Sequence, residues 1–343
     1  MSIFSLTRRV ILSGAAAAIA SIGLSGTAFA EDHISFEGET VTIVSFGAPG
    51  SPPDVWYRSL APYLKRHLPG NPDIDFINKP GAGSMISANY TAQAVKPDGF
   101  TVGTFNAIAM TKAAKGDPSA KFNLREMQIL GANQLTRVIP VKLDGVSNID
   151  ELIAREGELI IGMESDATPY FSSFFKLAGI DGRIISSYQR FPDTLQAFRS
   201  GEVDAMPMSN IEWLTFGPDL SQNGVEAIWQ FGYIKDGEVT AVEKPDVPTG
   251  HDVIRRINPD AVGGDDWNEM LVAVAGQSVS NEIWAPAGTP PEYAAVWAQA
   301  FFDAVNDPEF QAEHEKAYGI PASWTDAATA RAIVDSVLEV YGN

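Results

Sequence analysis

The sequence predicts an α/β protein with mostly parallel sheets flanked by helices. Short β-branched segments alternate with amphipathic helical segments in the first half of the chain, and the alternation returns after residue 157. The chain has 343 residues, of which 45% are hydrophobic, enough for two domains with cores of their own. Strands that alternate with helices form parallel sheets, because each helix returns the chain to the same edge.

The first 30 residues have the features of an export signal peptide. Arg8 and Arg9 precede an apolar stretch, and Ala28, Phe29 and Ala30 form an A-x-A cleavage site. The run "TRRVIL" also resembles a twin-arginine signal, so the export route stays open. Cleavage after Ala30 is expected to leave a periplasmic protein.

The composition excludes several classes of function. With 24 basic and 43 acidic residues the formal charge is −19, and it becomes −21 once the two arginines of the signal are removed. Such a charge argues against nucleic acid or an anionic membrane surface as partner. The chain has no cysteine, and its four histidines lack the spacing of metal ligands, so no metal or other cofactor is expected.

Two strand–helix units and a third strand open the mature chain. Residues 40–48 form a β-branched strand, and the helix after it carries Trp56, Leu60 and Leu64 on one face. Residues 73–79 are the second strand, before a helix over 84–95, and residues 100–106 are the third, ended by a small-residue loop. Later units repeat the pattern as a strand over 158–165, a helix over 170–179 with a glycine stop, and a strand over 183–188. Residues 235–250 are the most loop-like long segment and a candidate crossover.

Two strand-to-helix turns carry the candidate chemistry. The first has Ser51 as N-cap, two prolines, and Asp54 three residues later. In the second, "NKPGAGS", Gly81 and Gly83 allow close approach to the backbone, and Ser84 can donate. Uncovered N–H groups at a helix start attract anions, and ligands of open α/β sheets bind beyond the carboxyl ends of strands. The alternative is that both turns are tight connections and nothing more.

Two common hydrolase motifs are missing from the sequence. The string "GAGSM" lacks the G-x-S-x-G spacing of a nucleophile elbow. The string "HEKAY" at His314 lacks the second histidine of H-E-x-x-H. The protein is therefore expected not to be an enzyme.

Six segments, taken in order, resemble the periplasmic receptors of tripartite tricarboxylate transporters, the Bug family. They are "SFGAPGSPPD", "NKPGAGS", "PDGFTV", "SSYQRFPDTLQAFRSGEVD", "PDVPT" and "APAGTP", and together they span the mature chain. The resemblance implies a two-domain periplasmic binding protein of the venus-flytrap type, which binds a small organic carboxylate without catalysis. It implies a monomer that delivers its ligand to the integral membrane components of the transporter. The alternative is a receptor that presents its ligand to a membrane sensor, with a periplasmic enzyme a distant third.

The resemblance also implies the ligand-binding residues. They are Phe46, Gly50, Ser51 and Asp54 in the first turn, Ala82, Gly83 and Ser84 in the second, and Asn106 after the third strand. The far domain is expected to contribute Ser165, Thr168, Tyr188, Arg190 and Asp204. Arg190 would pair with a second carboxylate, unless it is a solvated surface arginine. Valine at Gly83 is expected to block binding while the protein stays folded.

The expected first domain comprises residues 31–138 and 250–343, and the second comprises residues 139–249. The chain is expected to cross near residues 137–141 and to return over 244–256. This sequence departs from the family pattern at "SDATPY", with Asp166 and Tyr170, and at Phe191. These changes leave open an aliphatic, amino-acid or aromatic-acid ligand, including one with an aromatic or positively charged far group.

Overall fold

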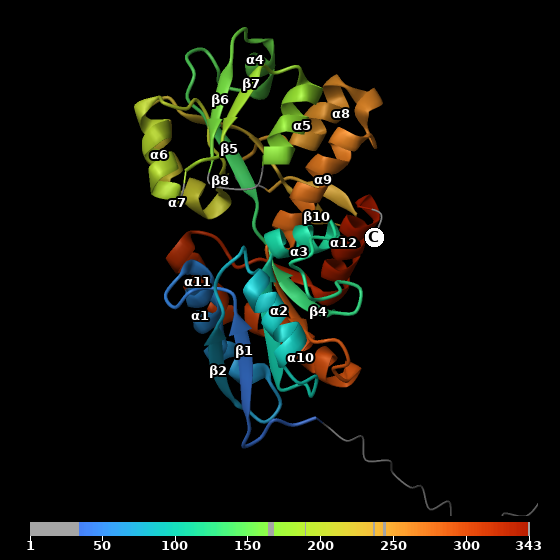
Figure 1. The fold of residues 1–343 in the computed structure, drawn as a ribbon. Helices are drawn as coiled ribbons and strands as arrows, with labels where there is room; N and C mark the ends of the chain where they lie inside the picture. The colour runs from blue at the N-terminus through green and yellow to red at the C-terminus, as the bar shows by residue number, and fades with distance from the viewer. Residues whose placement is uncertain (1–33, 164–167, 189, 236, 243–244, 342–343) are drawn as a thin grey trace, which may run out of the picture. The chain divides into compact units, whose positions relative to one another are not determined.

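A six-stranded sheet organises one half of the structure, a computed structural model that describes residues 34–163, 168–188, 190–235, 237–242 and 245–341 (Figure 1). Its strands are β1 (Thr40–Ser45), β2 (Asp73–Asn78), β3 (Thr101–Asn106), β4 (Gln128–Asn133), β12 (Asn281–Ala285) and β13 (Trp324–Asp326). They lie in the order β13-β4-β12-β3-β1-β2. The sheet therefore combines segments from the beginning and the end of the chain.

Most strands of this sheet run in one direction. The strand β1 pairs in parallel with β2 and β3. The strand β12 is antiparallel to both of its neighbours, β3 and β4, and β13 is antiparallel to β4. It follows that β1, β2, β3 and β4 share a direction, and that β12 and β13 oppose them.

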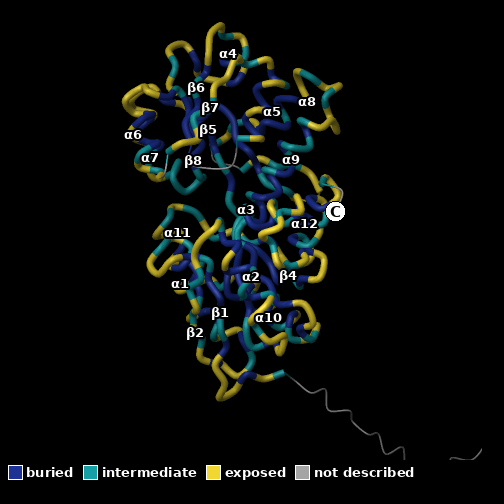
Figure 2. Tube along the Cα trace, viewed as in Figure 1, coloured by how far each residue is buried: buried dark blue, intermediate teal, exposed yellow. Residues whose placement is uncertain are grey.

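Helices cover both faces of the six-stranded sheet. One core packs α1 (Pro52–His67), α10 (Pro291–Val305) and α11 (Pro308–Tyr318) against it, around Trp56, Ile283 and Trp297. The opposite core packs α2 (Met85–Ala94), α3 (Ala107–Ala114) and α12 (Ala327–Val340) around Phe105 and Trp284. Buried residues follow the strands and the inward sides of these helices (Figure 2).

A second sheet is built from the middle of the chain. Its strands are β5 (Arg137–Val141), β6 (Leu159–Gly162), β7 (Gly182–Ile185), β8 (Met208–Ser209) and β9 (Glu226–Gln230). The strand β5 is antiparallel to β8 and β9, and β6 is parallel to β7. Ala205 bridges β5 and β6, antiparallel to Val141 and parallel to Ile161. The resulting order, β7-β6-β8-β5-β9, repeats the order β2-β1-β3-β12-β4 of the first sheet.

The helices of this half pack on the second sheet in two cores. One core contains α4 (Ile149–Ala154), α5 (Thr168–Ala178), α8 (Gly250–Ile257) and the first part of α9 (Asp265–Ser278). The other contains α6 (Phe191–Ser200) and α7 (Asn210–Ser221). A hairpin of β10 (Tyr233–Lys235) and β11 (Glu238–Thr240) and a 3-10 turn, η1 (Pro259–Ala261), complete the described elements.

Each sheet contains one strand that enters directly from the other. The strand β5 follows β4, and β12 follows α9, and each is inserted antiparallel to its neighbours. The domain boundaries expected from the sequence stay predictions. Because Val253 and Ile254 of α8 pack into the core over the second sheet, we propose that the return crossing lies within α9, later than residue 250.

Several predicted strand–helix units are confirmed. The strands β1, β2, β3, β6 and β7 and the helices α1, α2 and α5 lie where the alternating patterns placed them, within a few residues at their ends. The loop expected after the third strand is wrong: the alanine-rich segment forms the helix α3, capped by Asn106. The glycine stop after α5 is Gly179, with φ 69°. From Ile34 to Asn343 the chain forms one compact unit. Within the described residues, no helix combines the length and the apolar character that crossing a membrane requires.

Candidate ligand-binding site

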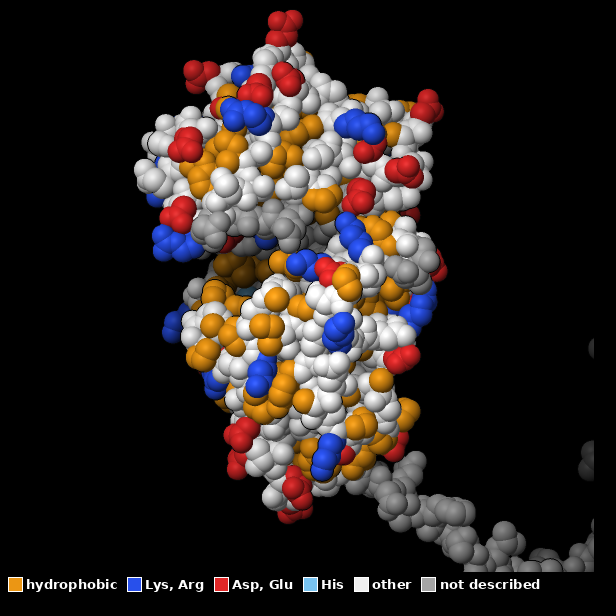
Figure 3. All heavy atoms as spheres, viewed as in Figure 1, with side chains coloured by type: hydrophobic (Ala, Val, Ile, Leu, Met, Phe, Trp, Pro, Cys, Tyr) orange, Lys and Arg blue, Asp and Glu red, His pale blue; other side chains and the backbone are white. Residues whose placement is uncertain are grey.

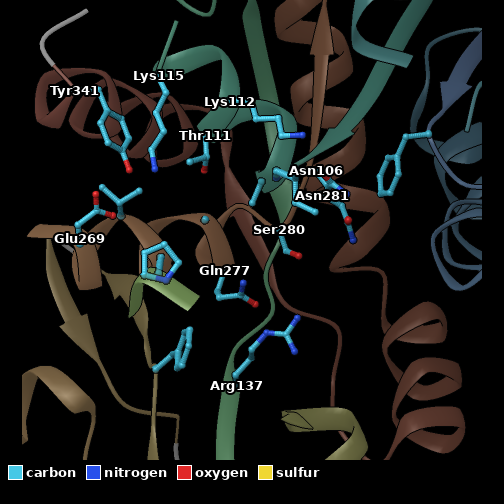
Figure 4. Close-up of a pocket in the computed structure, with 18 of the residues that line it drawn as sticks. Asn106, Thr111, Lys112, Lys115, Arg137, Glu269, Gln277, Ser280, Asn281 and Tyr341 are labelled. Atoms are coloured by element: carbon cyan, nitrogen blue, oxygen red, sulfur yellow. Dashed lines mark hydrogen bonds between the residues drawn. The ribbon is translucent and has the colours of Figure 1, made fainter. Parts of the chain in front are cut away.

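A cavity of about 600 Å³ opens between α3, α9, the start of β5 and the turn after β1. The space-filling view shows a recess beside basic and apolar side chains (Figure 3). Its polar lining consists of Asn106, Thr111, Lys112, Lys115, Arg137, Glu269, Gln277, Ser280, Asn281 and Tyr341, drawn in Figure 4. Its apolar lining includes Phe46, Pro53, Ile108, Phe231 and Val272. The volume falls within the range of about 300–1,000 Å³ that is usual for small-molecule sites.

The helix α3 brings two lysines to this cavity. Asn106 caps the helix, and its side-chain oxygen accepts from the backbone N–H groups of Ile108 (3.1 Å) and Ala109 (3.4 Å). A capped, alanine-rich segment is a good helix former, which fixes the direction of the side chains that follow. Lys112 and Lys115 are three residues apart, so they lie on one side of the helix, and both line the cavity.

Arg137 is the first residue of β5 and stands where the chain passes from one sheet to the other. Its backbone carbonyl accepts from the N–H of Phe231 at 2.8 Å, which holds the residue in place. Its side-chain Nε is buried and has no hydrogen-bond partner among the described residues. Leaving a buried charged donor unpaired costs free energy, and the guanidinium stays protonated in proteins. This Nε can therefore donate to an acceptor on a ligand.

The charges around the cavity are mostly positive. Lys112, Lys115 and Arg137 line it with one acidic residue, Glu269. None of the three cations forms an ion pair with another described residue, whereas other basic side chains do, such as Arg256 with Asp150 at 2.6 Å. In a chain with a formal charge of −19, a cavity with unpaired cations is suited to an anion.

The first predicted turn is a hydrogen-bonded frame beside the cavity. Phe46 lines the cavity, and its N–H donates to Thr104 Oγ1 at 3.1 Å. Asp54 is buried, and its oxygens accept from Gly50 N–H (2.9 Å), Arg58 Nε (3.0 Å) and Asn78 Nδ2 (2.7 Å). Burial opposes ionisation of Asp54, but these hydrogen bonds and the charge of Arg58 hold its pKa below the ordinary value.

In this turn the N–H of Gly50 and the hydroxyl of Ser51 differ in their remaining hydrogen-bonding capacity. The N–H of Gly50 is already used by Asp54. Ser51 is the N-cap of α1 without a side-chain cap bond, and its Oγ is buried without a partner among the described residues. Asp54 therefore holds the turn together, and Ser51 Oγ is the atom with unused hydrogen-bonding capacity.

The second predicted turn runs through four consecutive left-handed residues. Gly81, Ala82, Gly83 and Ser84 have φ values of 122°, 53°, 61° and 68°. Ser84 Oγ lies 2.9 Å from Asn106 Oδ1 and accepts from the N–H of Asn106, also at 2.9 Å. Of these residues Asn106 lines the cavity, and Gly83 lies behind Ile108, which does.

The predicted residues of the other half lie apart from the cavity lining. Tyr188 donates to Glu202 Oε1 at 2.9 Å, and Asp204 Oδ2 accepts from the N–H of Ile160 at 2.8 Å. Arg190 pairs with Asp193 at 2.9 Å, and its side chain is 72% exposed. Thr168 begins α5 next to Pro169, which lines the cavity. Ser165 lies outside the described residues, as does Asp166.

The basic residues of the cavity were not among the residues predicted from the sequence. Lys112 and Lys115 stand three apart in "MTKAAKG", two lysines in an alanine-rich helix of a strongly acidic chain. That contrast was a usable signal. Arg137 carries no comparable signal, because its importance comes from its place between the two sheets.

Comparisons with solved structures show what this fold is similar to. A TctC solute-binding protein from Polaromonas, solved without ligand, has a TM-score of 0.68 and 17% identity, over 90% of this chain and 98% of that one. The periplasmic binding protein BugD has a TM-score of 0.57 and 19% identity, over 88% and 95%. MatC from Rhodopseudomonas palustris with bound malate has a TM-score of 0.56 and 18% identity, over 88% and 97%.

These similarities define the class of fold. The chain has the α/β fold of periplasmic solute-binding proteins, as the sequence resemblance predicts, and the similarity covers nearly all of it. No protein-family model and no curated protein matches the sequence.

Proposed function

We propose that the protein is a periplasmic solute-binding receptor of the tripartite tricarboxylate transporter type. It captures a small carboxylate in the cavity between α3, α9 and the start of β5, and delivers it to the membrane components of the transporter. It is exported by its N-terminal segment, acts as a monomer and does not turn its ligand over. Its two sheets belong to two domains that close on the ligand.

The observation that carries this proposal is Arg137 with its buried, unpaired Nε at the cavity wall. A carboxylate there would satisfy the guanidinium with charge-assisted hydrogen bonds, which are stronger than neutral ones. Lys112 supplies a second positive charge from α3. Asn106, Ser280 and Asn281 supply polar groups in the lining of the same cavity (Figure 4). The malate in MatC, a protein of the same fold, supports a carboxylate as the ligand class.

Calorimetric titration of the purified protein with carboxylates tests this proposal. We expect Arg137→Gln and Lys112→Gln each to weaken binding by about ten-fold or more, because each removes a charge from a partly desolvated anion site. Lys96→Gln is the matched control, since Lys96 is an exposed lysine outside the cavity lining. Equal affinities in all four proteins would place the binding site elsewhere and contradict the proposal.

A further inference from the structure

The cavity has two ends with different charge. The helix α9 runs along it and lines it with Glu269, Ala273, Gly276 and Gln277. At a rise of 1.5 Å per residue, the eight steps from Glu269 to Gln277 correspond to about 12 Å along the helix. A ligand that contacts both ends must therefore be extended.

The Gln277 end contains the cations assigned above to the carboxylate. The carbonyl of Gln277 accepts from the N–H of Leu135 at 2.9 Å, two residues before Arg137. Ser280 follows at the end of the helix, and its carbonyl accepts from the N–H of Ala107 at the start of α3. In the close-up Arg137 extends toward Ser280, away from Glu269 (Figure 4). This end is positive.

The Glu269 end carries one charge of each sign, Glu269 and Lys115. Lys115 Nζ lies 4.9 Å from the centre of the Tyr341 ring. Burial raises the pKa of the Tyr341 hydroxyl, and the negative charge of Glu269 raises it further while Lys115 opposes that effect. The three side chains therefore lie close enough to influence one another, and Figure 4 shows them together on one side of the cavity. Glu269 forms no ion pair within the described part of the chain, and besides its interaction with the Tyr341 hydroxyl its carboxylate can accept from a ligand.

We propose that Glu269, beside a Lys115 that lies over the Tyr341 ring, makes the receptor selective for an extended monocarboxylate with a hydrogen-bonding far end. The carboxylate of the ligand binds at Arg137 and Lys112, and a hydroxyl or ammonium group at the other end binds at Glu269. A second carboxylate there meets the charge of Glu269 and is disfavoured. A short dicarboxylate such as malate cannot reach both ends. This inference rests on the proposed function and names its ligand class.

Three six-carbon probes of similar length test this selectivity: ε-aminocaproate, ω-hydroxycaproate and adipate. They share one carboxylate and differ at the far end, which is cationic, neutral or anionic. We expect the wild-type protein to bind the first two more tightly than adipate, measured by calorimetry at neutral pH.

Two substitutions of opposite charge sharpen the test. Glu269→Gln leaves Lys115 unbalanced, so adipate binding should strengthen and ε-aminocaproate binding weaken, each by about five-fold. Lys115→Gln should shift both affinities in the opposite directions. Circular dichroism checks that both variants are folded, and Lys96→Gln again serves as control.

The outcomes separate the two proposals. If Arg137→Gln weakens all three probes but Glu269→Gln and Lys115→Gln change them in parallel or not at all, the selectivity is wrong and the receptor function stands. If Arg137→Gln and Lys112→Gln leave every affinity unchanged, the carboxylate site itself is wrong. Wild-type protein that binds none of the probes at millimolar concentration overturns both.

Discussion

Glu282 is a buried acid in the middle of the six-stranded sheet. It lies on β12 opposite Phe105 of β3 and Ala132 of β4, and it is fully buried. Both carboxylate oxygens lack a hydrogen-bond partner among the described residues. Burial raises the pKa of Glu282 well above its ordinary value, and burial, with a smaller contribution from the charge of Glu282, raises the pKa of Tyr57. The proton on Glu282 is therefore held more tightly in the folded protein than in the unfolded chain.

This shift makes the stability depend on pH. Below the pKa that Glu282 has in the unfolded chain, its carboxyl is protonated in both the folded and the unfolded state, and its burial costs no ionisation free energy. As the pH rises toward the folded-state pKa, this cost to stability grows. We expect Glu282→Gln to raise the melting temperature by about 2 °C or more at neutral pH and to have little effect near pH 4. Thermal unfolding at both pH values measures this, with exposed Glu39→Gln as control. An equal effect at the two pH values would show that the gain does not come from ionisation.

Asp54, which was predicted to bind the ligand, instead stabilises the turn after β1 through its hydrogen bonds. Its carboxylate joins the first turn, Arg58 of α1 and Asn78 of β2. Asn78 also donates to the carbonyl of Gly47 at 2.7 Å. Both residues lie in segments that resemble the family motifs, and here they hold the two strand ends and the helix start together. The positions next to the cavity are fixed as a consequence.

At the scale of elements, the start of α2 depends on Gly83. A Cβ at this position would lie 2.7 Å from Cγ2 of Ile108 on α3, and φ is 61°. Gly83→Val is therefore expected to destabilise the fold as well as to block a ligand, because valine collides with Ile108 and is strained in a left-handed conformation, so this variant alone cannot separate the two effects. The glycine is required by the packing of α2 against α3 as well as by any ligand.

A double substitution separates packing from backbone strain. Gly83→Ala should lower the free energy of unfolding by about 2–4 kcal/mol, from strain and overpacking together. Ile108→Ala in the same chain removes the collision, so the two substitutions together should cost less than the sum of their separate effects. Urea unfolding of the wild type, both single variants and the double variant gives the coupling free energy between positions 83 and 108. Strict additivity would mean that the two side chains do not interact.

At the scale of the whole molecule, charge is distributed unevenly. A chain with a formal charge of −19 places three cations around one cavity. The acidic exterior disfavours anionic macromolecules as partners, while the cavity attracts a small anion over short range. Screening by salt limits the range of interactions between exposed charges to about 10 Å. A small anionic ligand is consistent with both features.

The N-terminal segment gives a prediction at the same scale. Protein recovered from the periplasm of an expressing bacterium should begin at Glu31, after cleavage behind Ala30. Intact-mass measurement checks the terminus, and Ala28→Asp combined with Ala30→Asp should prevent cleavage because the cleavage site requires small residues. A periplasmic protein with its first 30 residues intact would contradict the assignment.

The sequence alone was sufficient for the α/β class, for the strand–helix units of both halves and for the two strand-to-helix turns. These features depend on local patterns, such as the β-branched run of β1, the prolines that start α1 and the glycines near α2. The motif resemblance extended this to the whole fold.

Only the tertiary structure decided which side chains surround the cavity. Arg137 is far in the chain from Glu269 and Gln277, which both lie on α9, and the three come together because β5 and α9 both connect the two sheets. No local sequence pattern predicts that these side chains line one cavity, since their proximity depends on the path of the chain between the sheets. Asp54 and Arg190 are the opposite case, since both were predicted ligand-binding residues. Asp54 pairs with Arg58 one turn later in α1, and Arg190, the N-cap of α6, pairs with Asp193. These local partners satisfy the charge that a ligand was expected to bind.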